Sequence, residues 1–241
     1  MLSSCRIHEK YKYTLKRIKK LREVPISMAS IIESIKHIYP ATLMIDYPDK
    51  ALNRLTSFFR LIVAIPICVI IGLMSNTAFT AGSQNWRTGA TAGGLLFLPL
   101  VLMILFRNKY PKWWFDWNLA LTKFSFRVSS YVLLLRDEYP STDEEQAVHL
   151  GLTYPDVQTQ LNRGLPLIKW FLAIPHYIVL CFLSIASIVV CIIAWFSILF
   201  TGHYPRGLFD FTVGVLRWTL RVSAYVFLLT TDKYPPFSMA A

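Results

Sequence analysis

Long runs of apolar residues separated by short polar segments dominate the pattern along the chain. Residues 165–200 are apolar apart from the charged Lys169, and residues 96–106 continue a stretch of small residues. A run of about 18 or more mostly apolar residues is typical of a transmembrane helix. The pattern therefore predicts an integral membrane protein.

The first half of the chain is predicted to form a helical hairpin. Its helices cover residues 54–74 and 90–107, and residues 75–89 between them have the Gly, Asn, Ser and Thr content of a loop. Pro66 falls inside the first helix, and Pro175 falls in the corresponding part of the second half. A proline inside a helix removes one backbone hydrogen bond, so we expect a kink at each.

The second half is predicted to form a matching hairpin. A single helix over residues 165–200 would be about 54 Å long, against a hydrocarbon core of about 30 Å. The segment must therefore either fold back or bend along the interface. Two helices, at residues 163–183 and 186–202 with a turn near Ser184, fit the bilayer thickness and the repeat, so we expect the segment to fold back.

The two halves repeat one sequence pattern. "YPDKALNRL" from Tyr47 matches "YPDVQTQLNRGL" from Tyr154, and "LIVAIP" then matches "WFLAIP". Further on, "YPKWWFDWNLALTKFSFRVSSYVLLL" from Tyr110 matches "YPRGLFDFTVGVLRWTLRVSAYVFLL" from Tyr204. Internal self-similarity of this kind is typical of a duplicated structural unit. We therefore treat the chain as a tandem repeat.

The repeat predicts the domain organisation. Its regions are a basic cytoplasmic tail at 1–45, a first membrane repeat at 46–140, an acidic connector at 141–153 and a second membrane repeat at 154–237. The connector contains "STDEEQ" from Ser141, a capping-box pattern in which a hydroxyl and a later Glu satisfy open N–H groups. We expect a short helix to follow, over about residues 142–151.

Each copy carries a stripe of charged residues within its apolar pattern. An acid and two bases recur at spacings of 7 and 4, namely Asp116, Lys123 and Arg127, and Asp210, Arg217 and Arg221. These spacings place the three side chains on one face of a helix. A helix lying flat at the water–lipid interface would keep this face wet. A spanning helix would hold each charge in the bilayer at a cost of about 2.5–3.5 kcal/mol, so it is the less favoured alternative.

Together these elements predict an all-α membrane protein. Its two tandem repeats each consist of a transmembrane helical hairpin followed by an amphipathic interfacial helix, giving four spans in total. Spanning amphipathic helices would instead give three spans per copy and an inverted second repeat. Basic residues lie at 107–112, at 203–206 and in the tail, whereas residues 75–89 contain only Arg87. The positive-inside rule then places both termini in the cytoplasm of a multi-pass cell-membrane protein.

Composition and charge agree with this class. Hydrophobic residues make up 54% of the 241 residues and charged residues only 16%, against about 25% in ordinary globular domains. The net charge of +11 is concentrated in residues 1–24. Beside a membrane domain, such a tail attracts anionic lipid headgroups. The expected partners are therefore membrane lipids and other membrane subunits, and no nucleic acid.

The sequence contains no recognisable catalytic motif. Walker, GxSxG and HExxH patterns do not occur, the five histidines are scattered, and no pair of the four cysteines has CxxC spacing. We therefore expect no enzyme activity, no cofactor and no metal.

The arginines of the two LNR motifs, Arg54 and Arg163, are candidate binding residues. An arginine at the mouth of a hairpin can hold a lipid phosphate with two hydrogen bonds. Either could equally pair with the acidic connector or with Asp116 and Asp210. With the six residues of the charged stripes, they form the candidate set for binding lipid or a partner.

Three stretches carry a resemblance to a known family. "LNRGLPLIKWFLAIPHYIVL", "AWFSILFTGHYPRGLFDFTVGVLRW" and "RVSAYVFLLTTDKYPPF" resemble a bacterial and archaeal family of integral membrane proteins that is known only as a domain of unknown function. The resemblance extends over residues 45–237 and is stronger in the second copy. It implies a membrane fold and no catalytic residues.

The absence of catalytic patterns favours a non-catalytic role. We expect an accessory or scaffold subunit of a larger membrane complex, or a lipid-organising protein. The alternative is a small transporter or channel whose pathway is lined by Asp116, Asp210, Arg127 and Arg221.

Overall fold

The computed structural model describes residues 39–48, 51–74, 100–107, 109–142, 144, 146–156, 161–162 and 164–240. The chain divides into two compact units, Met1–Ile38 and Tyr39–Ala241. The first unit lies wholly outside the described residues. The fold is therefore that of the second unit.

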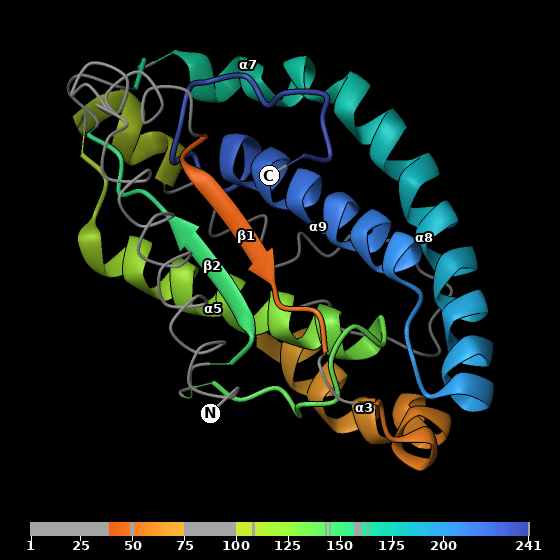
Figure 1. Cartoon of the computed structure of the whole chain (residues 1–241). Helices are drawn as coiled ribbons and strands as arrows, with labels where there is room; N and C mark the ends of the chain where they lie inside the picture. The colour runs from red at the N-terminus through yellow and green to blue at the C-terminus, as the bar shows by residue number, and fades with distance from the viewer. Residues whose placement is uncertain are drawn as a thin grey trace, which may run out of the picture. The chain divides into compact units, whose positions relative to one another are not determined.

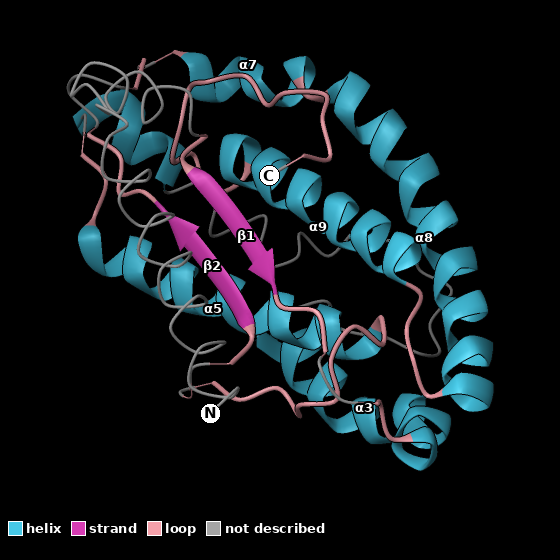
Figure 2. Ribbon diagram, viewed as in Figure 1, coloured by secondary structure: helices cyan, strands magenta, loops and turns pink. Residues whose placement is uncertain are grey.

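The described part of the second unit is mostly helical and contains a small sheet (Figure 1, Figure 2). In chain order the elements are β1 (Ala41–Ile45), α3 (Arg54–Met74), the π-helical turn η1 (Met103–Arg107), α5 (Lys112–Val132), β2 (Val148–Leu152), α7 (Leu165–Leu172), α8 (Ile174–Thr201) and α9 (Arg206–Val226). The helix predicted over residues 54–74 is confirmed with the same bounds. Both amphipathic segments are also helical, as α5 and α9.

Strands β1 and β2 pair antiparallel, with Leu43 opposite Leu150 at the centre of the register. Burial alternates along β1, because successive side chains of a strand point to opposite faces. Beyond each end of the ladder one more backbone bond forms, from Asp46 N–H to the Ala147 carbonyl and from Thr153 N–H to the Pro40 carbonyl. The expectation of a purely α-helical fold is therefore wrong.

Both strands lie in segments for which the sequence pattern predicted something else. Strand β1 falls within the predicted tail, and β2 overlaps the helix expected over residues 142–151. The Ser141 hydroxyl does accept a hydrogen bond from the Glu144 N–H (3.2 Å), but β2 then follows in place of a helix. The residues of β2, VHLGL, bury Val148 and Leu150 at alternate positions, and pairing with β1 supplies their backbone hydrogen bonds.

Helix α8 is continuous over 28 residues, so the turn expected near Ser184 is wrong. Neither Gly nor Pro occurs between Pro175 and Gly202, and the Ser184 hydroxyl donates to the Cys181 carbonyl inside the helix (2.9 Å). The break comes earlier, at Ala173, because Pro175 has no N–H with which to continue α7. At the other end, Gly202 adopts a left-handed conformation (φ 76°) and ends the helix.

The second helix of the first predicted hairpin is only partly described. Residues 100–102 are helical and lead into η1. Residues 75–99, which include the expected loop, lie outside the described residues. Pro66 lies inside α3, which continues on both sides of it.

The amphipathic helices lie between the sheet and the more apolar helices. Helix α9 contacts both β1 and α8, and α5 contacts both β2 and α3 (Figure 1). Ala194 late in α8 shares a core with Phe209 early in α9, whereas Tyr177 early in α8 shares another with Trp218 late in α9. Helices α8 and α9 therefore run antiparallel and pack together along their length.

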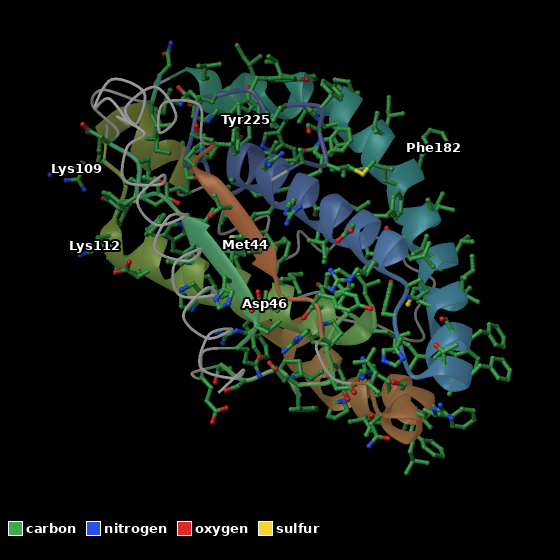
Figure 3. All side chains as sticks on the ribbon, in the orientation of Figure 1. Met44, Asp46, Lys109, Lys112, Phe182 and Tyr225 are labelled. Atoms are coloured by element: carbon green, nitrogen blue, oxygen red, sulfur yellow. The ribbon has the colours of Figure 1, made fainter. Side chains whose placement is uncertain are left out.

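Helix α8 is the one helix in the described ranges that is long and apolar enough to cross a membrane. Only 11% of its most apolar stretch is buried, and Figure 3 shows Phe182 projecting away from the helix. Soluble monomers rarely expose contiguous apolar patches larger than a few hundred Å². Helices α3 and α7 add further exposed apolar side chains, including Phe58, Phe59, Ile62, Val63, Leu167, Ile168 and Phe171.

Candidate functional site

An ion pair between a buried cation and a partly exposed acid joins α3 to the segment that follows α5. Arg60 is only 1% exposed, and its Nη2 pairs with the carboxylate of Asp137. Its Nη1 donates to the carbonyls of Tyr131 (3.2 Å) and Arg136 (3.0 Å). The guanidinium carbon also lies 4.7 Å from the centre of the Tyr131 ring, within the range of a cation–π contact. The cation is therefore held on several sides by the end of α5.

The end of α5 turns sharply, which brings these acceptors to Arg60. Leu134 adopts a left-handed conformation (φ 64°), and the Leu135 N–H donates to the Ser130 carbonyl (2.9 Å). This bond, together with that from Leu134 N–H to the Tyr131 carbonyl, is the pattern of a Schellman cap. Leucine tolerates the conformation here because its side chain is buried in the core.

A second ion pair joins α7 to the segment that follows α9. Lys169 is fully buried, and its Nζ lies 2.7 Å from Asp232 Oδ1. The Lys169 ammonium also donates to the Thr231 carbonyl (2.7 Å) and lies 4.9 Å from the centre of the Tyr225 ring. Each of these contacts has a counterpart around Arg60.

The two ion pairs occupy matching positions in the two sequence copies. Arg60 directly precedes "LIVAIP" and Lys169 directly precedes "WFLAIP", while the acids follow the matching α5 and α9 segments. In each copy the acid also accepts the backbone N–H of the asparagine in the LNR motif. The distances are 2.7 Å from Asn53 to Asp137 and 2.6 Å from Asn162 to Asp232. The backbone at this asparagine thus helps to hold the carboxylate in place in both copies.

Sequence reasoning did not select these two ion pairs. A signal was present, because a basic residue stands at the same place before an apolar run in both copies, and an acid precedes each closing Tyr-Pro. The partners Arg60 and Asp137 are separated by most of a repeat. Only the fold shows that they meet.

A pocket of about 540 Å³ lies beside Arg60, between α3, the end of α5 and α8. Its apolar wall includes Leu133, Leu134, Ile188, Ile192, Trp195 and Phe196. Ser57 and Arg60 are its polar lining residues, and Cys191 also lines it. The pocket therefore combines a largely hydrocarbon-like surface with one polar corner.

Two polar atoms at this corner have no partner among the described residues. They are the Ser57 hydroxyl oxygen and Arg60 Nε, and both side chains are about 1% exposed. The Ser57 carbonyl, in contrast, accepts a hydrogen bond from Trp195 Nε1 (3.2 Å). A buried polar group without a partner costs about 1–3 kcal/mol. The packing of α3, the end of α5 and α8 encloses both atoms, so each is an unfavourable local feature of the fold.

The predicted arginines of the charged stripes are largely covered by protein. Arg127 Nη1 donates to the Ser141 carbonyl (2.8 Å). Arg221 donates from Nη1 to the Ser238 carbonyl (3.2 Å) and from Nη2 to the Ala240 carbonyl (2.6 Å). Both arginines thus tie their helix to the chain segment that follows it.

The remaining predicted residues are spread over the unit. Arg217 Nε donates to the Leu43 carbonyl of β1 (2.8 Å), which links the stripe of α9 to the sheet. Asp116 and Asp210 are exposed, and Lys123 is half-buried. The exposed Arg54 lies near Gly202, at the end of α8. Arg163 lies outside the described residues. The members of this set that the structure describes do not gather into one site.

Tyrosines of the Tyr-Pro motifs connect the two copies. The Tyr47 hydroxyl donates to the Tyr204 carbonyl, and the Tyr154 hydroxyl donates to the Tyr110 carbonyl (2.6 Å). Burial raises the pKa of the Tyr110 hydroxyl, and it raises the pKa of Tyr204 to about 12 although a hydrogen bond with Thr212 acts the other way. Both hydroxyls are therefore neutral at physiological pH.

Among the described residues no group of His, Cys, Asp and Glu side chains is arranged to hold a metal ion. The free cysteines Cys181 and Cys191 both lie on α8. The polar features of the described unit are therefore its buried cations, Arg60 and Lys169, with the backbone carbonyls that accept their hydrogen bonds. The apolar pocket lies beside Arg60.

Comparison with known protein families gives one match, which lies in the second copy. Residues 166–239 match the family model described as a domain of unknown function, DUF4389. The matched segment includes both Lys169 and Asp232 of the second ion pair. No curated protein and no solved structure matches the chain. The expected resemblance to a domain of unknown function is confirmed for this part of the chain.

Proposed function

We propose that this protein is an integral membrane protein without catalytic activity, which organises lipid or serves as an accessory subunit of a larger membrane complex. The observation that carries this proposal is the apolar surface of α8, of which so little is buried, extended by α3 and α7. Such a surface is stable only against lipid or against another apolar surface. The expected anionic-lipid contacts of the basic tail fit the same location.

We place α8 along the membrane surface, not across the bilayer. Helix α8 packs along the whole of α9, and α9 carries β1 on another side. A perpendicular α8 would therefore bring the sheet to the depth of the hydrocarbon. The outer edges of a two-stranded sheet carry N–H and C=O groups that lipid cannot satisfy. An in-plane α8 leaves the sheet in water.

This placement also assigns sides to the other elements. Helices α3, α7 and α8 lie on the lipid side, α5 and α9 lie at the interface, and the sheet lies on the aqueous side. We further propose that both termini are cytoplasmic, because segments rich in Lys and Arg favour that side of a membrane. Four spans would need a turn inside α8, which the continuous helix does not provide.

Depth measurements along α8 separate the two orientations. Spin labels at the exposed positions Ile178, Ile185 and Ile193, in a background without native cysteines, report how deeply each site lies in a vesicle membrane. An in-plane helix gives equal depths. A helix that crosses the bilayer places the three labels at clearly different depths, and that result would overturn the placement.

Purification in mild detergent addresses the role itself. We expect the protein to resist extraction from membranes by alkaline carbonate and to carry lipid or a membrane partner through purification. A protein released by carbonate, or a monomer that retains neither lipid nor partner, contradicts the proposal. A transport pathway lined by Asp116, Asp210, Arg127 and Arg221 has less support, because both arginines are engaged with backbone carbonyls.

A further inference from the structure

We propose that the turn between α8 and α9 binds the phosphate of an anionic membrane phospholipid, whose acyl chains lie against the end of α8 and the start of α3. The phosphate is held by a basic cluster that consists of Arg54, His203 and Arg206. This inference rests on the proposed function, because the membrane supplies the lipid. It adds to that function a defined site and a defined headgroup chemistry.

The fold brings the basic cluster together from two distant parts of the sequence. The carbonyl of Gly202, the residue that ends α8, accepts a hydrogen bond from the Leu52 N–H (2.9 Å). Arg54 stands two residues further on, and its Nε lies 3.8 Å from the point where a side chain at Gly202 would begin. His203 and Arg206 follow Gly202 directly, between α8 and the first residue of α9. The start of α3 therefore places its arginine at the turn that carries the other two residues.

All three side chains of the cluster are exposed, so a ligand can reach them. Within the described part of the chain, neither Arg54 nor Arg206 forms an ion pair or a hydrogen bond through its side chain. The Arg206 guanidinium carbon lies 4.4 Å from the centre of the Tyr47 ring, within the range of a cation–π contact. His203 Nδ1 donates to the Thr201 carbonyl (3.0 Å), which holds the imidazole at the turn.

The charge of the cluster selects an anionic phosphate. A guanidinium is always charged, and its forked N–H groups match two oxygens of a phosphate. Asp210 is exposed one turn along α9 from Arg206 and forms no ion pair with a described residue. Two arginines and one acid leave the turn positively charged. Such a turn disfavours a headgroup that carries a cation of its own, so an anionic phospholipid is preferred to a zwitterionic one.

The apolar surface beside the cluster selects a lipid. Phe200 in the last turn of α8 is 77% exposed, and Leu55 next to Arg54 is also exposed. Phe58 of α3 stacks on Trp195 of α8, with 6.0 Å between the ring centres, and Figure 1 shows the end of α8 beside α3. The two helices thus present apolar side chains next to the basic cluster. Acyl chains would cover this surface, whereas a soluble phosphate compound would leave it in water.

A competition between two phospholipids tests the selectivity of the full chain. The protein, purified in mild detergent, is mixed with equal amounts of phosphatidylglycerol and phosphatidylcholine that have the same acyl chains. Lipid that stays bound through detergent exchange is extracted and quantified by mass spectrometry. We expect about tenfold more phosphatidylglycerol than phosphatidylcholine. Equal amounts of the two lipids would overturn the proposal.

Two double variants with the same change of charge localise the bound headgroup. Arg54→Gln with Arg206→Gln removes both arginines of the cluster. Lys109→Gln with Lys112→Gln removes two exposed cations at the start of α5, where Figure 3 shows both lysines on the side of the unit away from the end of α8.

The preference for phosphatidylglycerol should fall below about twofold in the arginine variant and stay near tenfold in the lysine variant. The basic N-terminal segment is intact in both, so it does not contribute to the difference. An equal loss in the two variants would show an effect of net charge alone and would overturn the site. Circular dichroism of both variants verifies that they remain folded.

The headgroup without its acyl chains separates a membrane lipid from a soluble phosphate ester. We expect glycerophosphoglycerol not to displace bound phosphatidylglycerol even when it is in large excess. Displacement at equal concentration would overturn the choice of a lipid. Phe200→Ser should lower the total amount of bound lipid several-fold and leave the ratio of the two lipids unchanged, because the apolar surface does not distinguish headgroups.

The outcomes also separate this inference from the proposed function. A protein that resists carbonate extraction but binds both phospholipids equally would disprove the basic cluster as a headgroup site and leave the membrane role intact. A protein that carbonate releases from the membrane would disprove the membrane role first.

Discussion

The two ion pairs share a scaffold and differ in one cation. In the first copy Arg60 Nη1 donates to two backbone carbonyls and Nη2 pairs with Asp137. Its Nε has no hydrogen-bond partner among the described residues. In the second copy Lys169 has a single nitrogen, and it lies against the Thr231 carbonyl and Asp232. A buried cation nitrogen without a described partner therefore occurs at Arg60 and not at Lys169.

The neighbouring position strengthens the difference. Three residues before the cation stands Ser57 in the first copy and Pro166 in the second. Serine adds a second buried polar atom without a described partner beside Arg60, whereas proline adds none. The two matching sequence segments therefore build similar ion pairs that differ in how completely the surrounding polar atoms are satisfied.

Removal of the acid should have the largest effect. Asp137→Ala leaves Arg60 buried without its counter-ion, and the loss of one partner of a buried pair typically costs about 3–5 kcal/mol. Thermal unfolding in detergent micelles measures the loss. Glu138→Ala, at the exposed neighbouring acid, should cost at most about 1 kcal/mol. Similar values for the two variants would mean that the Arg60 pair is not a buried structural contact.

Exchange of the cation should have an intermediate effect. Arg60→Lys keeps the charge but cannot reach both carbonyls and Asp137 in the same geometry, so we expect a loss of about 1–2 kcal/mol. The reciprocal Lys169→Arg forces a larger group into a fully buried position and should also destabilise the protein. If neither exchange lowered the stability, the two ion-pair sites would accept arginine and lysine equally well, and the predicted difference between them would be wrong.

The tyrosine bonds between the copies should have smaller and similar effects. Tyr47→Phe and Tyr154→Phe each remove one hydroxyl-to-carbonyl hydrogen bond, worth about 0.5–1.5 kcal/mol. Chemical unfolding in micelles of constant composition compares the two variants. Clearly unequal losses would show that the matching contacts do not contribute equally to the link between the copies.

The smallest effect at neutral pH comes from the buried tyrosine hydroxyls. Folding raises the pKa of Tyr204 to about 12, from about 10 in the unfolded chain. The folded state therefore holds this proton more tightly, and stability is constant below about pH 10 and falls as the pH rises towards about 12. Tyr204→Phe should flatten that part of the profile of unfolding temperature against pH. An unchanged profile would contradict the burial of the hydroxyl.

The helices were predictable where a long periodic pattern identified them. The bounds of α3 followed from its apolar run, and α5 and α9 followed from the spacing of their charged residues. The strands were not predictable from the sequence, because β1 and β2 are only five residues long and lie beside charged or acidic segments. The length argument that placed a turn near Ser184 assumed a helix perpendicular to the bilayer. Helix α8 has no residue that would break it there.

The candidate site was hidden for a different reason. Periodicity predicts which residues share a helix face, but it does not predict which distant segments meet. Arg127 and Arg221 were selected for their spacing, and the fold uses them to hold the segments after α5 and α9. Arg60 appears in the sequence as one charge in an apolar helix. Its importance depends on the turn at Leu134, which brings the acceptors to it.

The central pairing of Leu43 with Leu150 has a consequence for the independence of the halves. The strand that precedes each copy is completed only by the strand that precedes the other, and α9 packs on β1 while α5 packs on β2. A severed half would expose the second edge of its strand as well as the outer edge that is already open, together with the buried strand residues, such as Leu43 or Leu150. Such an edge is self-complementary in the manner of an isologous dimer interface, so a lone half would recruit a second copy of itself.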